Sequence, residues 1–433
     1  MTLHSHKERT SSLAISELQE PSYLIYVEKY NWRRGFLLLD FVLQEDCQRF
    51  CAHYQRSQEQ TLTSPSTLML VNTKIPATRS IREGQVYRVP HRALYGMDWH
   101  FPSPQDEETI LARVHAAPLP ATFFENTVAT TEVEEECTYS ISSTLTDHAR
   151  IQEMLDASFS PEKGPLSVIV KQVDQGSWNE IRAGDCLTAI FDFGCSIHWS
   201  ATRCKNAVSS LSLQDHPILI ISHWDIDHYK LLEAVSDAQL RQLNCAILPH
   251  TCISATSKRM AKRLEFLCPN VVAVPPAPKT SRFIGMDVLF QGGHYMLQVG
   301  HNSANVNLSG LALTLWGSHG CVFLCADHSY SQLFQHMKPK FLSISKTFWD
   351  KRKLLNCTPL PCHMVVPHHG GHAGAIKATY SLANSSIQPD LAVISTGPNY
   401  YGHPFPWVET ALSGLGLQVT RVDILGRDVS LNL

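Results

Sequence analysis

The sequence predicts an α/β fold in two domains, with a C-terminal sandwich of sheets flanked by helices. Its 433 residues exceed what one average core contains, so two domains are expected. Two prolines and a glycine within residues 160–165 interrupt both helix and strand, and we place the boundary between residues 160 and 161. Beyond it, short β-rich runs alternate with helical segments, which is typical of layered α/β folds.

Residues 1–160 predict a mixed α+β domain of unknown function. They contain apolar stretches such as residues 35–39 and two expected helices. One helix begins at Ser103-Pro104, where a serine N-cap precedes proline and three acidic residues. The other covers residues 146–158. This segment is also a candidate for docking a protein partner.

Residues 161–433 predict a series of short strands joined by turns and helices. In chain order the strands cover residues 166–173, 186–193, 218–222, 245–249, 271–274, 286–291, 295–300, 311–316 and 321–325. We expect the last two to form a hairpin through Gly317-Ser318-His319-Gly320. A helix is expected over residues 229–243, where Leu232, Val235 and Leu243 are among the apolar positions.

Composition indicates a globular protein of the cytoplasm. Hydrophobic residues make up 44% and charged residues 17% of the chain, and no apolar run approaches the ~20 residues that span a bilayer. The N-terminus lacks the layout of a signal peptide. The 13 cysteines include no Cys-x-x-Cys pair and are expected to be buried thiols. The net charge of −3 gives no global attraction to nucleic acid.

Four metal-ligating side chains follow the apolar run at residues 218–221. His223, Asp225, Asp227 and His228 fall within six residues. Carboxylates and imidazoles resist burial unless they are paired or bound to a metal. The cluster therefore predicts a metal site at the end of a buried strand.

The order of several motifs resembles the metallo-β-lactamase superfamily over residues 166–433. The cluster is similar to the superfamily's His-x-His-x-Asp-His signature, with Asp225 in place of its second histidine. Asp192 in Phe191-Asp192-Phe193-Gly194 resembles the strand-end aspartate beneath the site. Asp327 resembles the aspartate that bridges two metals, and His369 in Pro-His-His-Gly the last histidine ligand. The resemblance implies an αββα sandwich.

One branch of the superfamily is most similar: the nuclease-like domain of bacterial DNA-uptake channel proteins and related stand-alone hydrolases. The similarity rests on the His-x-Asp-x-Asp-His, Asn-x-Ser-Gly-Leu and Pro-His-His-Gly runs and on residues 395–404. By spacing to Ser309, Asn305 or Asn307 takes the place of a middle histidine, and His301 is a weaker candidate.

The resemblance implies two divalent metal ions. The expected ligands are His223 and Asp225 for one ion and Asp227, His228 and His369 for the other, with Asp327 as the bridge. Asn305, Asn307, His368 and Asp192 are expected to support these ligands or to replace one. Aspartate in place of histidine adds a hard oxygen donor, so Mn²⁺ competes better with Zn²⁺, and Mg²⁺ is a third candidate.

Two residues are assigned catalytic roles. Two divalent ions about 3.5–4 Å apart can activate water at neutral pH and stabilise transition-state charge. Asp227 would position the nucleophile. His403 would contact the substrate phosphate or donate a proton to the leaving group, with a purely structural turn residue as the alternative.

Basic residues favour nucleic acid as the substrate. One patch contains Lys351, Arg352 and Lys353 with aromatic residues interleaved nearby, which suits backbone contact and base stacking. The other contains Lys258, Arg259, Lys262 and Arg263 at helical spacing. Each patch alone is more often a solvated face. Beside a metal site they favour a two-metal phosphodiesterase, acting as a nuclease on DNA.

Two alternatives remain open at this point. The same metal site also suits a small ester, lactone or thioester, because this fold hosts many chemistries. In the second alternative the chain is a non-catalytic or regulatory subunit of a multiprotein system, such as a defence system, and residues 1–160 dock the partner.

Overall fold

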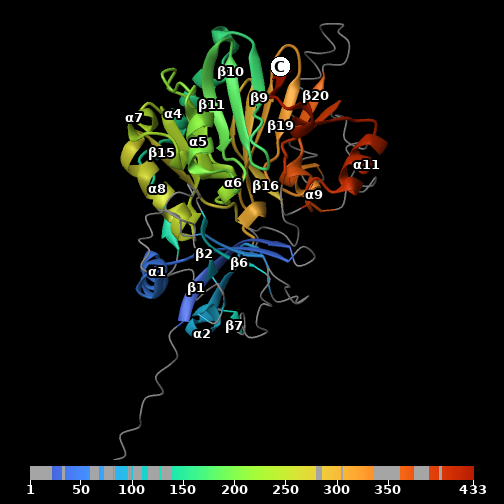
Figure 1. Ribbon diagram of the computed structural model, residues 1–433. Helices are drawn as coiled ribbons and strands as arrows, with labels where there is room; N and C mark the ends of the chain where they lie inside the picture. Colours follow the sequence, from blue (N-terminus) through green and yellow to red (C-terminus); the bar gives the residue numbers. More distant parts are fainter. Residues whose placement is uncertain are drawn as a thin grey trace, which may run out of the picture.

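Three seven-stranded sheets and one two-stranded sheet organise the described part of the chain (Figure 1). The computed structural model describes residues 22–31, 35–58, 68–72, 81, 83–95, 97, 99–100, 110–115, 126–127, 138–278, 285–303, 306–334, 361–374, 390–398 and 402–433.

The N-terminal sheet has the strand order β5-β6-β3-β2-β1-β4-β7. Its strands are β1 (Ser22–Asn31), β2 (Phe36–Phe41), β3 (Leu68–Asn72), β4 (Val86–Pro90), β5 (Trp99–His100), β6 (Ile110–His115) and β7 (Asn126–Thr127). Alternate residues of β1 and β2, among them Ile25 and Leu39, pack with Phe50 of α1 (Gln44–Gln58) and Leu94 of α2 (His91–Tyr95). The predicted mixed α+β character of this segment is confirmed.

The first sheet of the C-terminal part has the order β15-β13-β12-β11-β10-β9-β23. Its strands are β9 (Leu166–Val170), β10 (Trp178–Ala183), β11 (Cys186–Phe193), β12 (Ile218–Ile220), β13 (Cys245–Pro249), β15 (Val271–Val274) and β23 (Val429–Asn432). Helices α5 (Ala201–Val208), α7 (Asp237–Leu240) and α8 (Ala255–Leu267) cover its outer face, where Leu219 packs in one core with Val208 and Leu264.

The second sheet has the order β16-β17-β18-β19-β20-β21-β22. Its strands are β16 (Met286–Gln291), β17 (Tyr295–Gly300), β18 (Leu311–Trp316), β19 (Cys321–Leu324), β20 (Cys362–Val365), β21 (Leu391–Ile394) and β22 (Gln418–Arg421). Helices α9 (Tyr330–Phe334) and α11 (Pro406–Gly414) cover its outer face, through residues such as Leu333 and Leu412.

A continuous apolar core joins the two C-terminal sheets. It contains Val168, Ile181 and Ile220 from the first sheet and Leu297, Leu313 and Val322 from the second. Helices on the outer faces complete four layers, and the predicted αββα sandwich is confirmed. Helix α4 (His148–Ser158) adds Ile151 and Leu155 to this core, although it precedes the boundary that the sequence predicts.

Most predicted elements agree with the structure, and one does not. The antiparallel hairpin of β18 and β19 pairs Trp316 with Cys321, as expected. The single helix predicted over residues 229–243 is wrong, because three short helices replace it: α6 (Ile226–Tyr229), a 3₁₀ turn (Lys230–Glu233) and α7. Ser236 and Gln239 form a capping box that starts a new helix. The helix predicted from Ser103 lies outside the described residues.

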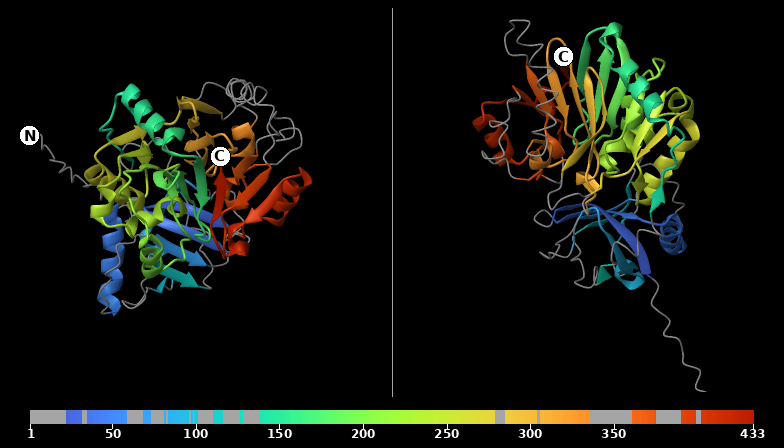
Figure 2. Two further views of the ribbon diagram at one scale, coloured as in Figure 1. Left: turned by 90° about the horizontal axis from the view of Figure 1, so that it is seen from above. Right: turned by 180° about the vertical axis from the view of Figure 1, so that it is seen from behind.

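The N-terminal sheet packs against the sandwich at the edge where α6 and α8 lie (Figures 1 and 2). Leu38 of β2 belongs to the outer core that α8 shares. Asp40 Oδ2 accepts the Thr256 N–H at 3.0 Å, and Lys258 Nζ donates to the Val42 carbonyl at 2.8 Å. Among the described helices, none is both long and apolar enough to cross a membrane.

Candidate metal centre

The central ligand loop begins at the buried strand β12. This strand lies between β11 and β13 with parallel pairing on both sides, so its carboxyl end opens at the same edge as theirs. The chain then enters α6, for which Asp225 is the N-cap residue. This single turn places Asp227 and His228 beside His223, and all three side chains are buried.

Two further loops leave the second sheet at its facing edge. Strands β19 and β20 run parallel, so Asp327 after β19 and His369 after β20 arrive at the same edge. Ala326, His368 and His369 have φ values of 47°, 51° and 52°. Non-glycine residues rarely adopt this left-handed region, and such backbone strain gathers at functional sites.

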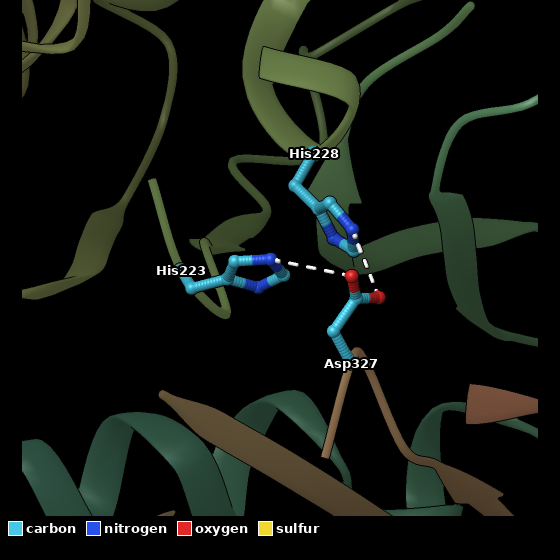
Figure 3. A group of neighbouring side chains, drawn as sticks. All are labelled: His223, His228 and Asp327. Carbon is cyan, nitrogen blue, oxygen red and sulfur yellow. Dashed lines mark ion pairs between the residues drawn. The ribbon is translucent and has the colours of Figure 1, made fainter. Parts of the chain in front are cut away.

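These three loops converge on one buried cluster, of which Figure 3 shows His223, His228 and Asp327. His228 Nε2 lies 3.2 Å from Asp327 Oδ1, and His223 Nε2 lies 3.7 Å from Asp327 Oδ2. His369 Nε2 lies 3.6 Å from Asp227 Oδ2. Two groups therefore suit a metal ion: His223, His228 and Asp327, and Asp227, His228 and His369.

Asp192 fixes the orientation of the ligand loop from below. Its Oδ1 accepts the Ser222 N–H at 2.7 Å, and its Oδ2 accepts the Ser222 hydroxyl at 3.0 Å. His228 Nδ1 donates to Asp192 Oδ2 at 2.8 Å. His228 Nδ1 therefore carries a proton, and Nε2 is the ring atom that faces the cluster.

The other two histidines are held in the same tautomer. The Ser222 hydroxyl is donated to Asp192, so His223 Nδ1 donates to Ser222 Oγ, at 2.9 Å. His369 Nδ1 donates to the Ser395 carbonyl at 2.9 Å. Each imidazole thus keeps its proton on Nδ1 and directs Nε2 inward, the arrangement that a histidine ligand requires.

The inward-facing atoms fit a divalent cation. Within the described residues, Nε2 of His223, His228 and His369, both carboxylate oxygens of Asp227 and Oδ1 of Asp327 are buried without a hydrogen-bond partner. Buried polar atoms normally find such partners, and imidazole with carboxylate is a donor set typical of Zn²⁺ and Mn²⁺.

Two glycines let the backbone approach the ligand loop. A Cβ added at Gly194 would lie 1.8 Å from the Asp227 carbonyl oxygen, and one added at Gly310 would lie 2.4 Å from the Ser222 carbonyl oxygen. Any side chain at either position would push the loop away. This is the physical reason for glycine in the Asp-Phe-Gly and Ser-Gly-Leu runs.

The N-terminal sheet contributes a residue that sequence reasoning missed. Lys29 of β1 donates from Nζ to Asp225 Oδ2 at 2.5 Å, and its side chain is 3% exposed. Burial lowers the pKa of Lys29, but Asp225, Asp227 and Asp327 together raise it well above its usual value, so the ammonium is charged. Burial alone would raise the pKa of Asp225, but Lys29 and His223 lower it.

Of the residues predicted to support the metal ligands, some contact Asp327 and others do not. His368 Nδ1 lies 2.9 Å from Asp327 Oδ2, and Asn307 Nδ2 donates to the same oxygen at 3.5 Å. Asn305 lies outside the described residues. His301 contacts the Gly285 N–H through Nδ1, at 3.2 Å.

His403 lines a cavity beside the cluster. The cavity has a volume of about 660 Å³, and its lining includes Lys29 and Glu83 from the N-terminal part and His368 and His403 from the sandwich. Gln175 Nε2 lies 3.1 Å from His403 Nδ1. Burial, followed by the nearby His368, lowers the pKa of His403 well below its usual range, so this imidazole is neutral.

Of the two predicted basic patches, the structure describes only the one on α8. Three members of the α8 patch are engaged inside the chain: Arg259 pairs with Glu233 at 2.7 Å, Arg263 with Asp237 at 2.7 Å, and Lys258 with the Val42 carbonyl. The fourth, Lys262, is exposed and lies over the ring of Tyr139. Their contact with nucleic acid stays a prediction, and Lys351, Arg352 and Lys353 lie outside the described residues.

Solved structures with a distant likeness to the chain include the two that follow. No family model and no curated protein sequence matches the chain. The metallo-β-lactamase fold protein YhfI from Bacillus subtilis aligns with a TM-score of 0.37 and 10% identity, over 62% of this chain and all of that one. The short form of human tRNase Z aligns with a TM-score of 0.32 and 12% identity, over 61% of this chain and 98% of that one. Neither likeness assigns an activity.

Proposed function

We propose that this protein is a metal-dependent hydrolase that cleaves phosphodiester bonds, with DNA as the leading substrate. One observation carries the proposal: buried nitrogen and oxygen atoms without hydrogen bonds converge from three loops onto one point. Leaving such atoms unpaired is costly, and a metal ion removes that cost. We also propose a relationship to the DNA-uptake nuclease branch. It rests on the His-x-Asp-x-Asp-His, Asn-x-Ser-Gly-Leu and Pro-His-His-Gly motifs of the sequence.

Asp227, His228 and His369 would hold a divalent ion, with Asp327 adjoining. Zn²⁺ and Mn²⁺ suit this donor set best, and Mg²⁺ is a third candidate. When bound, the ion would supply charge to polarise the substrate and lower the pKa of water. Asp192 and Ser395 would keep two of the histidines aligned for this role.

The chain's own groups perform the remaining steps. A carboxylate oxygen of Asp227 that the ion does not use would accept a hydrogen bond from the attacking water and orient it. The neutral His403 accepts from Gln175 at Nδ1, which leaves its proton on Nε2. His403 would therefore hydrogen-bond a phosphoryl oxygen of the substrate. Donation of a proton to the leaving group, the other role predicted for His403, stays a prediction.

Phosphodiesters are favoured by hydrogen-bond donors in the cavity and by basic residues in the sequence. Lys29, His368 and His403 all line the cavity. Lys351, Arg352 and Lys353, in the segment between Asp327 and His368, would bind the polymer backbone. These groups suit an extended anion better than a neutral ester.

The cavity itself favours a second candidate, a small ester, lactone or thioester. A volume of about 660 Å³ is typical of small-molecule sites, and the N-terminal sheet contributes part of the lining. Such a substrate would need the same metal site but no basic surface beyond the cavity.

Cleavage assays with two variants test the proposal. Asp227→Ala and His228→Ala should abolish DNA cleavage in Mn²⁺, Mg²⁺ and Zn²⁺, because each removes a donor of the second group. His319→Ala, which removes an exposed histidine on the turn of the β18–β19 hairpin, should cleave like the wild type. Cleavage that survives both site substitutions would exclude this site as its source.

A further inference from the structure

Lys29 lies among three carboxylates of the predicted metal site. Its Nζ is 2.5 Å from Asp225 Oδ2, 3.6 Å from Asp227 Oδ1 and 3.8 Å from Asp327 Oδ2. A cation bound by Asp225 and Asp327 would compete with this ammonium for the same oxygens. The ammonium therefore already supplies a positive charge at that place.

A β-bulge directs Lys29 towards the site. In β1, Ile25 and Val27 face the core of the N-terminal sheet, and Tyr26 faces the opposite way. Strict alternation would turn Lys29 into that N-terminal core. The register with β2 pairs Val27 with Leu39 and Lys29 with Leu38, so Glu28 is an extra residue. This bulge reverses the direction of Lys29, a known use of bulges beside active sites.

Other contacts hold the strand in this position. The Tyr30 N–H donates to Glu83 Oε1 at 2.8 Å directly after Lys29. On the neighbouring strand, Asp40 accepts the Thr256 N–H at 3.0 Å. The lysine is thus fixed by the packing of the N-terminal sheet on the sandwich, rather than by one ion pair.

The donor set shows the consequence for metal binding. Asp225 belongs to neither of the donor groups in the described residues, and its Oδ2 is bonded to Lys29. In the group of Asp227, His228 and His369, Lys29 lies 3.6 Å from Asp227 Oδ1, whereas Asp227 Oδ2 faces His369 and has no hydrogen-bond partner.

The charge balance points the same way. One divalent ion and one ammonium neutralise the three negative charges of Asp225, Asp227 and Asp327. A second divalent ion would bind the same carboxylate oxygens as the ammonium, and repulsion between two cations in a buried site is strongly unfavourable.

We propose that Lys29 takes the place of the second metal ion, so that the chain holds a single divalent ion at Asp227, His228 and His369. This inference rests on the metal site of the proposed function and is independent of the substrate.

Metal content tests the proposal. The full-length protein is saturated with Mn²⁺, freed of excess metal and analysed for manganese per chain. The wild type should hold one ion and Lys29→Met two, because the methionine frees three carboxylates. Arg88→Met is the matched control, since Arg88 is an exposed cation on the adjacent strand β4 and bonds Ser22 Oγ; it should hold one ion.

Electron paramagnetic resonance of the same samples gives a second readout. Wild type should show the resolved hyperfine lines of isolated Mn²⁺, and Lys29→Met the signal of an exchange-coupled pair. A coupled pair in the wild type overturns the proposal even if Lys29→Met does not fold. One ion in both wild type and a folded Lys29→Met also overturns it.

The outcomes separate this inference from the proposed function. A wild-type chain that binds one ion but cleaves neither DNA nor a small ester contradicts the proposed function and supports the lysine assignment. A wild-type chain that binds no ion contradicts both.

Discussion

Oδ2 of Asp192 lies 2.8 Å from Nδ1 of His228, and the same carboxylate binds the backbone and hydroxyl of Ser222. Asp192 thus connects the end of β11 to the ligand loop after β12. A fully buried aspartate with a φ of 57° is energetically unfavourable. Asp192 orients His228, the histidine that belongs to both donor groups.

Asp192→Asn should weaken metal binding by about 10–100-fold, the usual effect of losing a partner behind a histidine ligand. The amide is neutral and no longer favours a proton on His228 Nδ1. Titration against a chromophoric chelator measures the affinity. Asp215→Asn is the matched control, because Asp215 is an exposed aspartate that accepts the Leu187 N–H at 2.9 Å and belongs to neither donor group. Equal affinity in both variants would show that Asp192 does not support the site.

His369→Ala should lower metal affinity on the order of 100-fold or more, whereas His368→Ala should lower it by about 10-fold or less. Of the two, only His369 belongs to a donor group, and His368 contacts Asp327 Oδ2 at 2.9 Å. The same chelator titration separates them. A larger loss for His368→Ala would reverse the assignment of the two neighbouring histidines.

Gly194→Ala should destabilise the protein by about 1–3 kcal/mol and weaken metal binding, because the new methyl group displaces the Asp227 backbone. Thermal unfolding and chelator titration measure the two effects. Gly293→Ala is the control: a Cβ there meets nothing within 4 Å, and its stability should change by no more than about 0.5 kcal/mol. Similar behaviour of the two variants would contradict the close approach of residues 194 and 227.

Simultaneous Lys351→Glu, Arg352→Glu and Lys353→Glu should raise KM for DNA and reduce its dependence on salt, because fewer phosphate charges are neutralised. Turnover of a small neutral ester should not change. Steady-state kinetics at several salt concentrations test this. If DNA cleavage is unaffected while an ester is hydrolysed, the small-ester function is favoured.

Local sequence patterns were sufficient to predict most strands of the sandwich. The predicted strands at residues 186–193 and 245–249 have the same bounds as β11 and β13, because short, mostly apolar runs mark strands buried in the middle of a sheet. The helix predicted over residues 229–243 is wrong because apolar spacing does not show a break. The break is caused by Ser236, which starts a new helix with its own cap.

The ligand loops could be predicted from sequence because several metal-ligating residues lie close together along the chain. The structure brings Asp227, Asp327 and His369 into one cluster, and their role as ligands stays a prediction. Lys29 could not be placed in the same way. Its only signal is a pair of charges, Glu28 and Lys29, inside an apolar strand; the bulge and the packing of two distant segments decide where the ammonium lies.

Anomalous X-ray diffraction from crystals grown with Mn²⁺ or Zn²⁺ tests the central claim most directly. A strong anomalous peak bounded by Asp227, His228 and His369 is the predicted result. Crystals of fully folded protein with no peak among these side chains, at saturating metal, would contradict a metal-dependent activity at this site.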